Sequence, residues 1–238
     1  MSLKKSILRY LRLNGVGIQK ISPMQEMIKI LSERQGSVRF VQIGANDGVS
    51  FDDFSELVKE YQLKGVCVEP IPRYHEVLSL VYRDWPGVKT LNAAIHPSNA
   101  TATIFSINPS KVRVVFQNGW ASFNREHLKK LGAEDHEIQE ETVACVTLSA
   151  VYEKFFSGER VDVIQIDTEG FDAEVVKMID FARFRPQIIR FEHTHLSDKD
   201  LKDTCDLLKS NGYLTRREYR DMIAYDPKEF QFSRFWKI

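Results

Sequence analysis

The sequence predicts an α/β fold in which a mainly parallel β-sheet is covered by helices on both faces. Three observations lead to this prediction. Short apolar runs alternate with segments of helical periodicity, glycines or acidic residues follow several of these runs, and the composition is that of an ordinary globular chain. Ligands of such sheets bind at the carboxyl ends of the strands, near the change in strand order. The residues that follow each predicted strand are therefore the functional candidates.

Length, charge and cysteine content exclude several classes of protein. The 238 residues fit one domain with a small appendage. Lys plus Arg and Asp plus Glu are both 33, so no excess of positive charge favours binding to nucleic acid. No run of about 18 apolar residues occurs, so we expect no transmembrane segment. The three cysteines form no CxxC pair, which favours a reduced, cytoplasmic protein.

The first 36 residues predict a helical extension, and residues 37–238 predict the main domain. Leu3, Ile7, Leu8 and Leu11 recur at helical spacing with basic residues between them. We expect this helix to pack on the domain or on a partner subunit, which would give a homo-oligomer, and a membrane surface is the alternative. A second helix is expected over residues 23–33, ending near Gly36.

The alternation of strands and helices begins after this extension. Strands are predicted at residues 38–43, 65–68 and 88–95, and the apolar faces of residues 54–61 and 74–81 indicate the helices between them. Residues 50–53 resemble a capping box for the first of these helices. The remaining strands are predicted at 161–166, 187–192, 213–219 and 222–225, with helices at 172–179 and at 197–211.

Residues 96–147 interrupt this alternation and predict an insert. Within it, residues 101–107 and 142–148 resemble strands, and residues 125–131 resemble a helix. Loops at the ligand edge of a sheet vary most freely, so we expect the insert on the acceptor side of any active site.

The turn after the first predicted strand contains two glycines in the segment Gly44-Ala45-Asn46-Asp47-Gly48. Glycines let a backbone approach a ligand closely, and the N-terminus of the next helix carries partial positive charge. A dinucleotide fingerprint would read GxGxxG, whereas this segment reads GxxxG with Asn46 at the middle position. This difference argues against NAD or FAD.

The second predicted strand ends at Glu69, which Pro70 follows. An acid at this position can accept hydrogen bonds from both hydroxyls of a ribose, and a solvated acid is the alternative. After the third strand, the small residues Asn92 and Ala93 leave room for an adenine, unless they only fill space beneath the insert. These features indicate a nucleoside cofactor without a pyrophosphate, and S-adenosyl-L-methionine fits that description.

A buried strand also ends at Asp167-Thr168-Glu169-Gly170. Two acids at a strand end are costly unless they are bonded or functional. We expect one of the acids to hold the cofactor amine or to orient the substrate, and we assign Asp167 to the cofactor. The other, Glu169, would assist proton removal. Capping of the next helix is the alternative reading.

The next strand ends at Glu192 and is followed by His193 and His195. The two histidines would share a face if the strand continued, and histidine is the usual general base near neutral pH. The predicted catalytic residues are therefore His193, Glu192 and Glu169. Asp167, Glu192 and His193 would also suit a divalent metal, although nothing in the pattern requires one.

Five motifs together resemble the FkbM family of S-adenosylmethionine-dependent methyltransferases. They are VQIGANDG (41–48), VEPIP (68–72), NAA (92–94), IDTEG (166–170) and RFEH (190–193). The resemblance covers about residues 38–225, with Thr168 where the family more often has valine. It implies a three-layer, Rossmann-like class I methyltransferase fold with seven strands. It also implies O-methylation, commonly of sugar or polyketide hydroxyls.

Three functions are compatible with these residues. The first is an O-methyltransferase for a glycan or small-molecule hydroxyl, with His193 or Glu192 as the base. The second is a nicotinamide-dependent oxidoreductase, which the missing middle glycine and the absence of a Tyr-x-x-x-Lys pair disfavour. The third is a non-catalytic binding module, which the acids at the strand ends disfavour.

Overall fold

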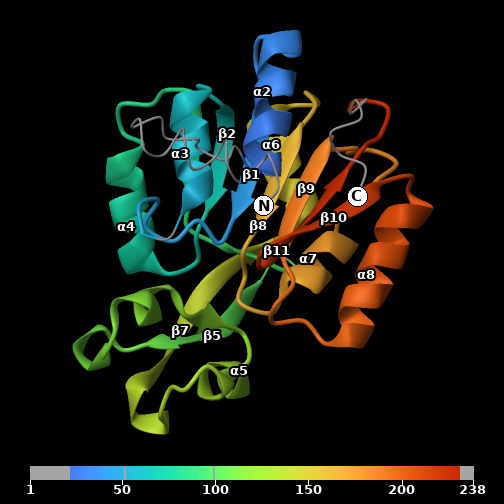
Figure 1. Cartoon of the computed structure of the whole chain (residues 1–238). Coiled ribbons are helices and arrows are strands. Elements are labelled where there is room, and N and C mark those ends of the chain that lie inside the picture. The colour runs from blue at the N-terminus through green and yellow to red at the C-terminus, as the bar shows by residue number, and fades with distance from the viewer. Residues whose placement is uncertain (1–21, 51, 99, 231–238) are drawn as a thin grey trace, which may run out of the picture.

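The computed structural model describes residues 22–50, 52–98 and 100–230. The helix predicted near the N-terminus, and any oligomer that it would form, lie outside these residues. Figure 1 shows the described chain as one large sheet with helices on both of its faces, and a smaller sheet beyond one end of the strands. The predicted α/β architecture is confirmed.

The large sheet has seven strands in the order β10-β11-β9-β8-β1-β2-β3. All neighbours pair in parallel except β11, which is antiparallel to both β9 and β10. The chain leaves β1 towards β2 on one side and later returns to β8 on the other, so the strand order reverses between β1 and β8. Ligands of such sheets bind at this point. The strands are β1 (Arg39–Ile43), β2 (Lys64–Val68), β3 (Val88–Leu91), β8 (Val163–Ile166), β9 (Ile188–Glu192), β10 (Leu214–Glu218) and β11 (Asp221–Tyr225).

Helices cover both faces of the large sheet, giving three layers (Figure 1). One face packs against α2 (Pro23–Gln35), α3 (Asp53–Glu60) and α4 (Pro72–Val81). The other packs against α6 (Leu148–Phe156), α7 (Asp172–Lys177) and α8 (Asp198–Ser210). No helix among residues 22–230 that the structure describes is long and apolar enough to cross a membrane.

The alternation of side chains along the central strands produces these two cores. Neighbouring residues of a strand point to opposite faces of the sheet. On β1, Phe40 belongs to the cluster beneath α2 and α3, whereas Val41 belongs to the cluster beneath α6 and α7. Val163 and Ile164 on β8 divide in the same way. Both faces are buried, which is why these strands appear in the sequence as continuous apolar runs.

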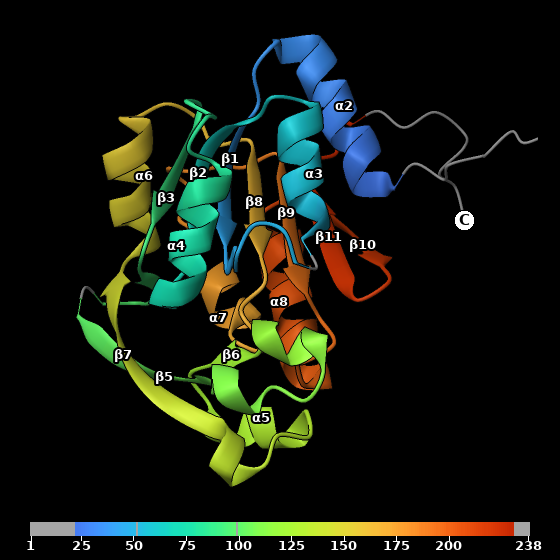
Figure 2. The same ribbon diagram turned by 90° about the vertical axis from the view of Figure 1, so that its left-hand side faces the viewer.

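The insert, together with the two residues before it, forms a second, four-stranded sheet in the order β4-β7-β5-β6. Its strands are β4 (Ala94–Ile95), β5 (Thr101–Ile107), β6 (Ala121–Ser122) and β7 (Ile138–Val146), with the short helix α5 (Arg125–Lys130) beside them. Three 3₁₀ turns complete it: η1 (Pro109–Lys111), η2 (Val115–Gly119) and η3 (Asp135–Glu137). Figure 2 shows this unit below the large sheet, beneath α4 and α7.

Two expectations about single elements were wrong, and one helix was not predicted. The strand predicted at 142–148 begins at Ile138 and ends at Val146, and residues 148–156 form α6, which was not predicted. Thr147 caps this helix by accepting the Ala150 amide at 3.1 Å, so strand and helix join without a glycine or proline to separate them. The run at 88–95 divides into β3 and β4, which belong to different sheets.

The start of α3 also differs from the prediction. Asp52, not Ser50, is the N-cap, and its Oδ1 accepts the amides of Phe54 and Ser55. Ser50 instead donates its hydroxyl to Asp47 at 2.7 Å. The pattern contained two residues able to cap, and the tertiary turn after β1 decided between them.

Candidate active site

A cavity of about 520 Å³ lies at the carboxyl ends of β1, β2, β8 and β9, facing the insert. This volume falls in the range of roughly 300–1,000 Å³ that is typical of small-molecule sites. It brings together residues that are far apart in the chain. Nine of the residues predicted from the sequence line it, namely Gly44, Ala45, Asn46, Glu69, Pro70, Ala93, Asp167, Glu169 and Glu192.

The other four predicted residues, Asp47, Gly48, Asn92 and His193, are not among the lining residues. Asp47 accepts the Ser50 amide at 2.6 Å and so shapes the turn after β1. A Cβ added at Gly48 would lie 2.8 Å from the Leu78 side chain on α4, so this glycine allows close packing. Both residues support the cavity wall from behind.

Asn92 and His193 also make backbone contacts beside the cavity. The Asn92 side chain donates to the carbonyl oxygens of Glu69 (2.8 Å) and Pro70 (3.0 Å), which holds the turn after β2. The His193 amide donates to the Arg220 carbonyl at 2.9 Å. Since β9 ends at Glu192, the chain turns at His193 and does not continue as a strand.

Gly44 brings the ends of β1 and β8 into contact. Its φ is +78°, and a Cβ added there would lie 1.7 Å from the carbonyl oxygen of Asp167. Only glycine combines this left-handed backbone with so close an approach. The glycine of the predicted turn is therefore required by the neighbouring strand as well as by the cavity.

Glu69 connects the turns after β1 and β2. Its side chain accepts two backbone hydrogen bonds: the Asn46 backbone N–H donates to Oε2 at 2.9 Å, and the Ile71 backbone N–H donates to Oε1 at 2.8 Å. Burial raises the pKa of this carboxyl to about 7, although the two amide bonds act in the opposite direction. Each carboxylate oxygen can accept a second hydrogen bond, so the group retains capacity for a ligand hydroxyl.

Asp167 is exposed to the cavity but lies deep among protein atoms. This loss of bulk solvation raises its pKa well above the usual value, and the neighbouring carboxylates of Glu169, Asp172 and Glu192 raise it further. Asp167, Glu169 and Glu192 each offer an oxygen within 4.8 Å of the others. A ligand that meets this group therefore faces concentrated negative charge and a readily protonated acid.

Asp172 holds the ends of β8 and β9 together beneath these acids. It is fully buried and accepts the Thr168 hydroxyl at 2.8 Å and the Glu192 amide at 3.1 Å. Burial raises its pKa to about 7. Neither Asp167 nor Glu169 caps α7, whose N-cap is Phe171 without a side-chain bond, so the capping alternative for these acids is not supported.

Two histidines reach the acids from different parts of the fold. His195, in the turn after β9, places Nε2 3.4 Å from Oε2 of Glu169 and 3.4 Å from Oε2 of Glu192. His127, on α5 of the insert, places Nε2 3.8 Å from the same Glu169 oxygen. No local pattern predicts the contact between His127 and Glu169, because it depends on how the insert docks.

Arg190, the first residue of the RFEH motif, is a further cavity residue. It is buried, and its guanidinium donates to Asp53 (2.9 Å) at the start of α3 and to Asp221 (3.0 Å) on β11. These pairs connect elements from both halves of the sheet at the cavity edge. The sequence did hold an indication of this, because Arg190 lies inside an apolar, β-rich run and a buried charge requires partners.

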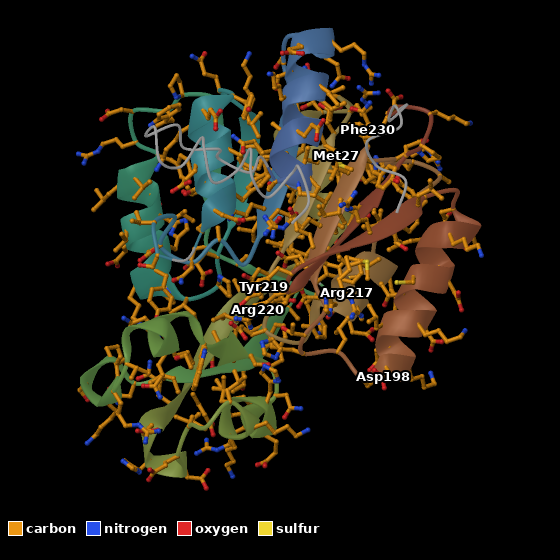
Figure 3. All side chains as sticks on the ribbon, viewed as in Figure 1. Met27, Asp198, Arg217, Tyr219, Arg220 and Phe230 are labelled. Atoms are coloured by element: carbon orange, nitrogen blue, oxygen red, sulfur yellow. The ribbon has the colours of Figure 1, made fainter. Side chains whose placement is uncertain are left out.

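The hairpin between β10 and β11 lies beside the same edge, close to the insert (Figure 3). Its turn contains Tyr219 and Arg220, which both line the cavity. Tyr219 is 90% exposed and has a left-handed φ of 52°. Arg220 places Nη2 2.6 Å from Oε1 of Glu192 and so offsets part of the negative charge.

The strand order and the acidic, glycine-containing strand ends define a Rossmann-like class I methyltransferase fold. A family model described as the methyltransferase FkbM domain matches residues 42–215. The chain belongs to this family. The resemblance drawn from the motifs is confirmed, and of the two enzyme classes left open by the sequence the methyltransferase is supported. Membership implies S-adenosylmethionine as the methyl donor.

A solved structure agrees with this fold. The crystal structure of methyltransferase FkbM from Methylobacillus flagellatus KT is 14% identical, with a TM-score of 0.52 over 83% of this chain and 47% of that one. The chain thus spans about half the length of that protein. A precorrin-6y C5,15-methyltransferase from Geobacter metallireducens GS-15 is 11% identical over 87% and 91% of the two chains, with a TM-score of 0.41. None of the curated proteins compared with this chain matches it.

The cavity residues fit the adenosyl part of this donor. The Glu69 carboxylate lies at the end of β2, where acids bind ribose hydroxyls in related sheets. The buried Oδ1 of Asn46 accepts no hydrogen bond within the described residues, so it is available to a ligand donor. Gly44, Ala45 and Ala93 add little side-chain volume to this side of the cavity. These residues would hold the nucleoside.

Proposed function

We propose that this protein is an O-methyltransferase that acts on a hydroxyl of a sugar, glycan or related natural product. The observation that supports it best is that Asn46, Glu69 and Asp167 line one cavity at the reversal of strand order. The residues proposed to bind the adenosyl donor therefore lie in the same cavity as the acids that follow β8 and β9. The donor and the acceptor would have to share this cavity.

The donor side consists of Asn46, Glu69 and Asp167. When bound, the donor supplies an electrophilic methyl group on a sulfonium. Glu69 accepts hydrogen bonds from the ribose hydroxyls, and the Asn46 backbone N–H, which donates to the Glu69 carboxylate at 2.9 Å, holds that carboxylate in place. Asp167 faces the positively charged end of the donor, where a carboxylate stabilises an ammonium or a sulfonium. Positioning of the donor against the acceptor contributes much of the rate of such a transfer.

The acceptor side consists of the insert and the β10–β11 hairpin. Trp120, Phe123 and Tyr219, which come from these two segments, also line the cavity. Aromatic faces pack against the apolar face of a sugar ring, and carboxylates accept hydrogen bonds from its hydroxyls. The concentration of carboxylates disfavours an anionic acceptor. We therefore propose a neutral, hydroxyl-rich acceptor.

Glu192 is the proposed base. It lines the cavity at the end of β9, and its Oε2 lies 3.4 Å from Nε2 of His195. As the acceptor oxygen bonds to the methyl carbon and the carbon–sulfur bond breaks, the hydroxyl proton passes to Glu192. His193, the other residue considered for this role, is not among the lining residues, so we prefer Glu192.

A screen of glycans and small alcohols with methyl-labelled donor tests this proposal. We expect transfer to at least one hydroxyl acceptor, a loss of kcat of about 10²–10⁴-fold for Glu192→Gln, and near wild-type kcat for His193→Ala. Binding of S-adenosylhomocysteine should persist in both variants. If the chain binds S-adenosylhomocysteine but methylates no acceptor, the binding-module alternative is favoured. If His193→Ala loses activity and Glu192→Gln does not, the assignment of the base is wrong.

A further inference from the structure

Two imidazoles and one carboxylate meet where the insert contacts the large sheet. His127 lies on α5, Glu169 follows β8, and His195 follows β9. Each residue offers one ligand atom, and the three atoms lie within 4.8 Å of one another. The proposed transfer does not use His127, so this convergence requires its own explanation.

The distances within the group suit metal ligands better than hydrogen bonds. Oε2 of Glu169 lies 3.4 Å from Nε2 of His195 and 3.8 Å from Nε2 of His127. A hydrogen bond between such atoms would measure about 2.7–3.2 Å. Ligands at about 2.1 Å from a tetrahedral metal lie about 3.4 Å apart. The side chains thus leave a gap close to the size of a small cation.

Two of the three ligand atoms are also buried without a hydrogen bond. Nε2 of His127 and Oε2 of Glu169 form no such bond within the part of the chain that the structure describes. The two side chains are 13% and 19% exposed. Buried polar atoms normally have a partner, and each such atom left without one costs about 1–3 kcal/mol. A cation between them would satisfy both.

The backbone places these side chains at some cost in strain. Glu169 has a left-handed φ of 49°, which is uncommon for a residue with a side chain and recurs at functional sites. Gly170 beside it has a φ of +97°, and a Cβ added there would lie 3.4 Å from the His127 ring, so this turn packs directly against the imidazole. The Ser122 hydroxyl donates to the Glu169 carbonyl at 3.0 Å and fastens the insert at this point.

We propose that His127, Glu169 and His195 bind a divalent transition metal, Zn²⁺ in preference to Mg²⁺. Two imidazoles and a carboxylate are a common ligand set for such ions, whereas Mg²⁺ selects oxygen ligands and keeps several waters. Glu169 and His195 line the cavity together with Asp167 and Glu192. A metal held there would polarise the acceptor hydroxyl, and Glu192 would take its proton. This role rests on the proposed function, whereas binding of the metal does not.

Arg220 is the competing positive charge at this site. Its Nη2 lies 3.1 Å from Nε2 of His195, within reach of the same lone pair. The Arg220 side chain is 52% exposed, so it can withdraw towards solvent when a cation binds. Replacing it with glutamine removes this competition, and we expect Arg220→Gln to bind the metal more tightly.

Co²⁺ provides a direct probe, because its visible absorption reports tetrahedral nitrogen and oxygen ligands. The full chain is stripped with chelator and titrated with Co²⁺, then with Zn²⁺ and Mg²⁺ by calorimetry. We expect one Co²⁺ per chain, displaced by Zn²⁺ and not by Mg²⁺. His127→Ala and His195→Ala should each weaken binding at least tenfold. His136→Ala is the matched control, since His136 lies exposed in the same insert and should leave binding unchanged.

The outcomes separate this inference from the proposed function. No Co²⁺ spectrum, or a spectrum that all three alanine variants retain, overturns the metal site, and methyl transfer that persists with chelator would then leave the function standing. Metal binding with the expected variant pattern, but no transfer to any acceptor, supports the site and rejects the function. If His127→Ala does not fold, Glu169→Gln preserves the side-chain volume and should also lose the spectrum.

Discussion

The backbone of Gly44 lies against the backbone of Asp167 so closely that a Cβ added at Gly44 would lie 1.7 Å from the Asp167 carbonyl oxygen. The two residues directly follow β1 and β8, the central strands between which the strand order reverses. The Asp167 amide also donates to the Ile43 carbonyl at 2.9 Å. The glycine turn after β1 and the acid after β8 are therefore held as one unit at the cavity.

Gly44→Ala should be strongly destabilising. The left-handed backbone costs an alanine about 1–2 kcal/mol, and displacing the Asp167 backbone adds about 1–3 kcal/mol. Urea unfolding measures the loss. Gly158→Ala is the control, because Gly158 has a φ of +87° but nothing within 4 Å of an added Cβ, so it carries only the first cost. Equal losses in the two variants would contradict the close approach.

The affinity for adenosyl ligands should depend on pH through Glu69. Its pKa is about 7 in the free protein because it is buried, and ribose hydroxyls that donate to the carboxylate favour its charged form. Binding therefore releases a proton, so affinity rises with pH, by about tenfold between about pH 6 and 8. Methylthioadenosine is a suitable ligand for calorimetry because it lacks the amino-acid tail.

Two variants isolate this effect. Glu69→Gln should bind the ligand more weakly and lose the pH dependence, while Glu56→Gln, at an exposed position of α3, should behave like the wild type. Glu69→Ala should abolish binding without unfolding the chain. An unchanged affinity in Glu69→Ala would reject the ribose role of this residue.

Asp172→Ala should loosen the ends of β8 and β9. The buried Glu192 amide would lose its acceptor, which costs about 1–3 kcal/mol of unfolding free energy. Urea unfolding near neutral pH checks this, with Asp180→Ala in an exposed turn as the comparison. A loss no larger than that of the comparison variant would mean that Asp172 does not hold the two strands.

The charge of Asp172 also predicts a pH effect on stability. Its pKa rises from 3.8 in the unfolded chain to about 7 in the folded one, because it is buried. Folding therefore favours the protonated form. The contribution of Asp172 to stability is complete below about pH 4 and is lost as the pH rises through about 7. Asp172→Asn cannot titrate, so wild type should lose stability relative to it between about pH 4 and 7; a constant difference would contradict the shift.

Tyr219→Ala tests the acceptor side. The side chain is 90% exposed, so its removal should change stability by less than about 0.5 kcal/mol. If Tyr219 packs on the acceptor, the KM for the acceptor should rise several-fold, while kcat and the affinity for S-adenosylhomocysteine stay near wild type. A fall in donor affinity, or no change in KM, would place the acceptor elsewhere.

The sequence by itself determined the sheet, the turn at Gly44, the acid of β2 and the acids at the ends of β8 and β9. These features depend on local patterns: apolar runs mark buried strands, and the topology of a parallel sheet brings the carboxyl ends of strands to one edge. It did not determine α6, because strand β7 passes into this helix through Thr147 with no local break.

Only the tertiary structure decided which polar residues behind the strand ends meet. The sequence does not distinguish His193 from His195, but the turn after Glu192 places His195, and not His193, among the residues that line the cavity. His127 is 42 residues from Glu169 in the chain, and it reaches that acid only because the insert packs its own small cores and docks through Ser122. Such contacts depend on long-range packing between two sheets, which no periodicity along the chain encodes.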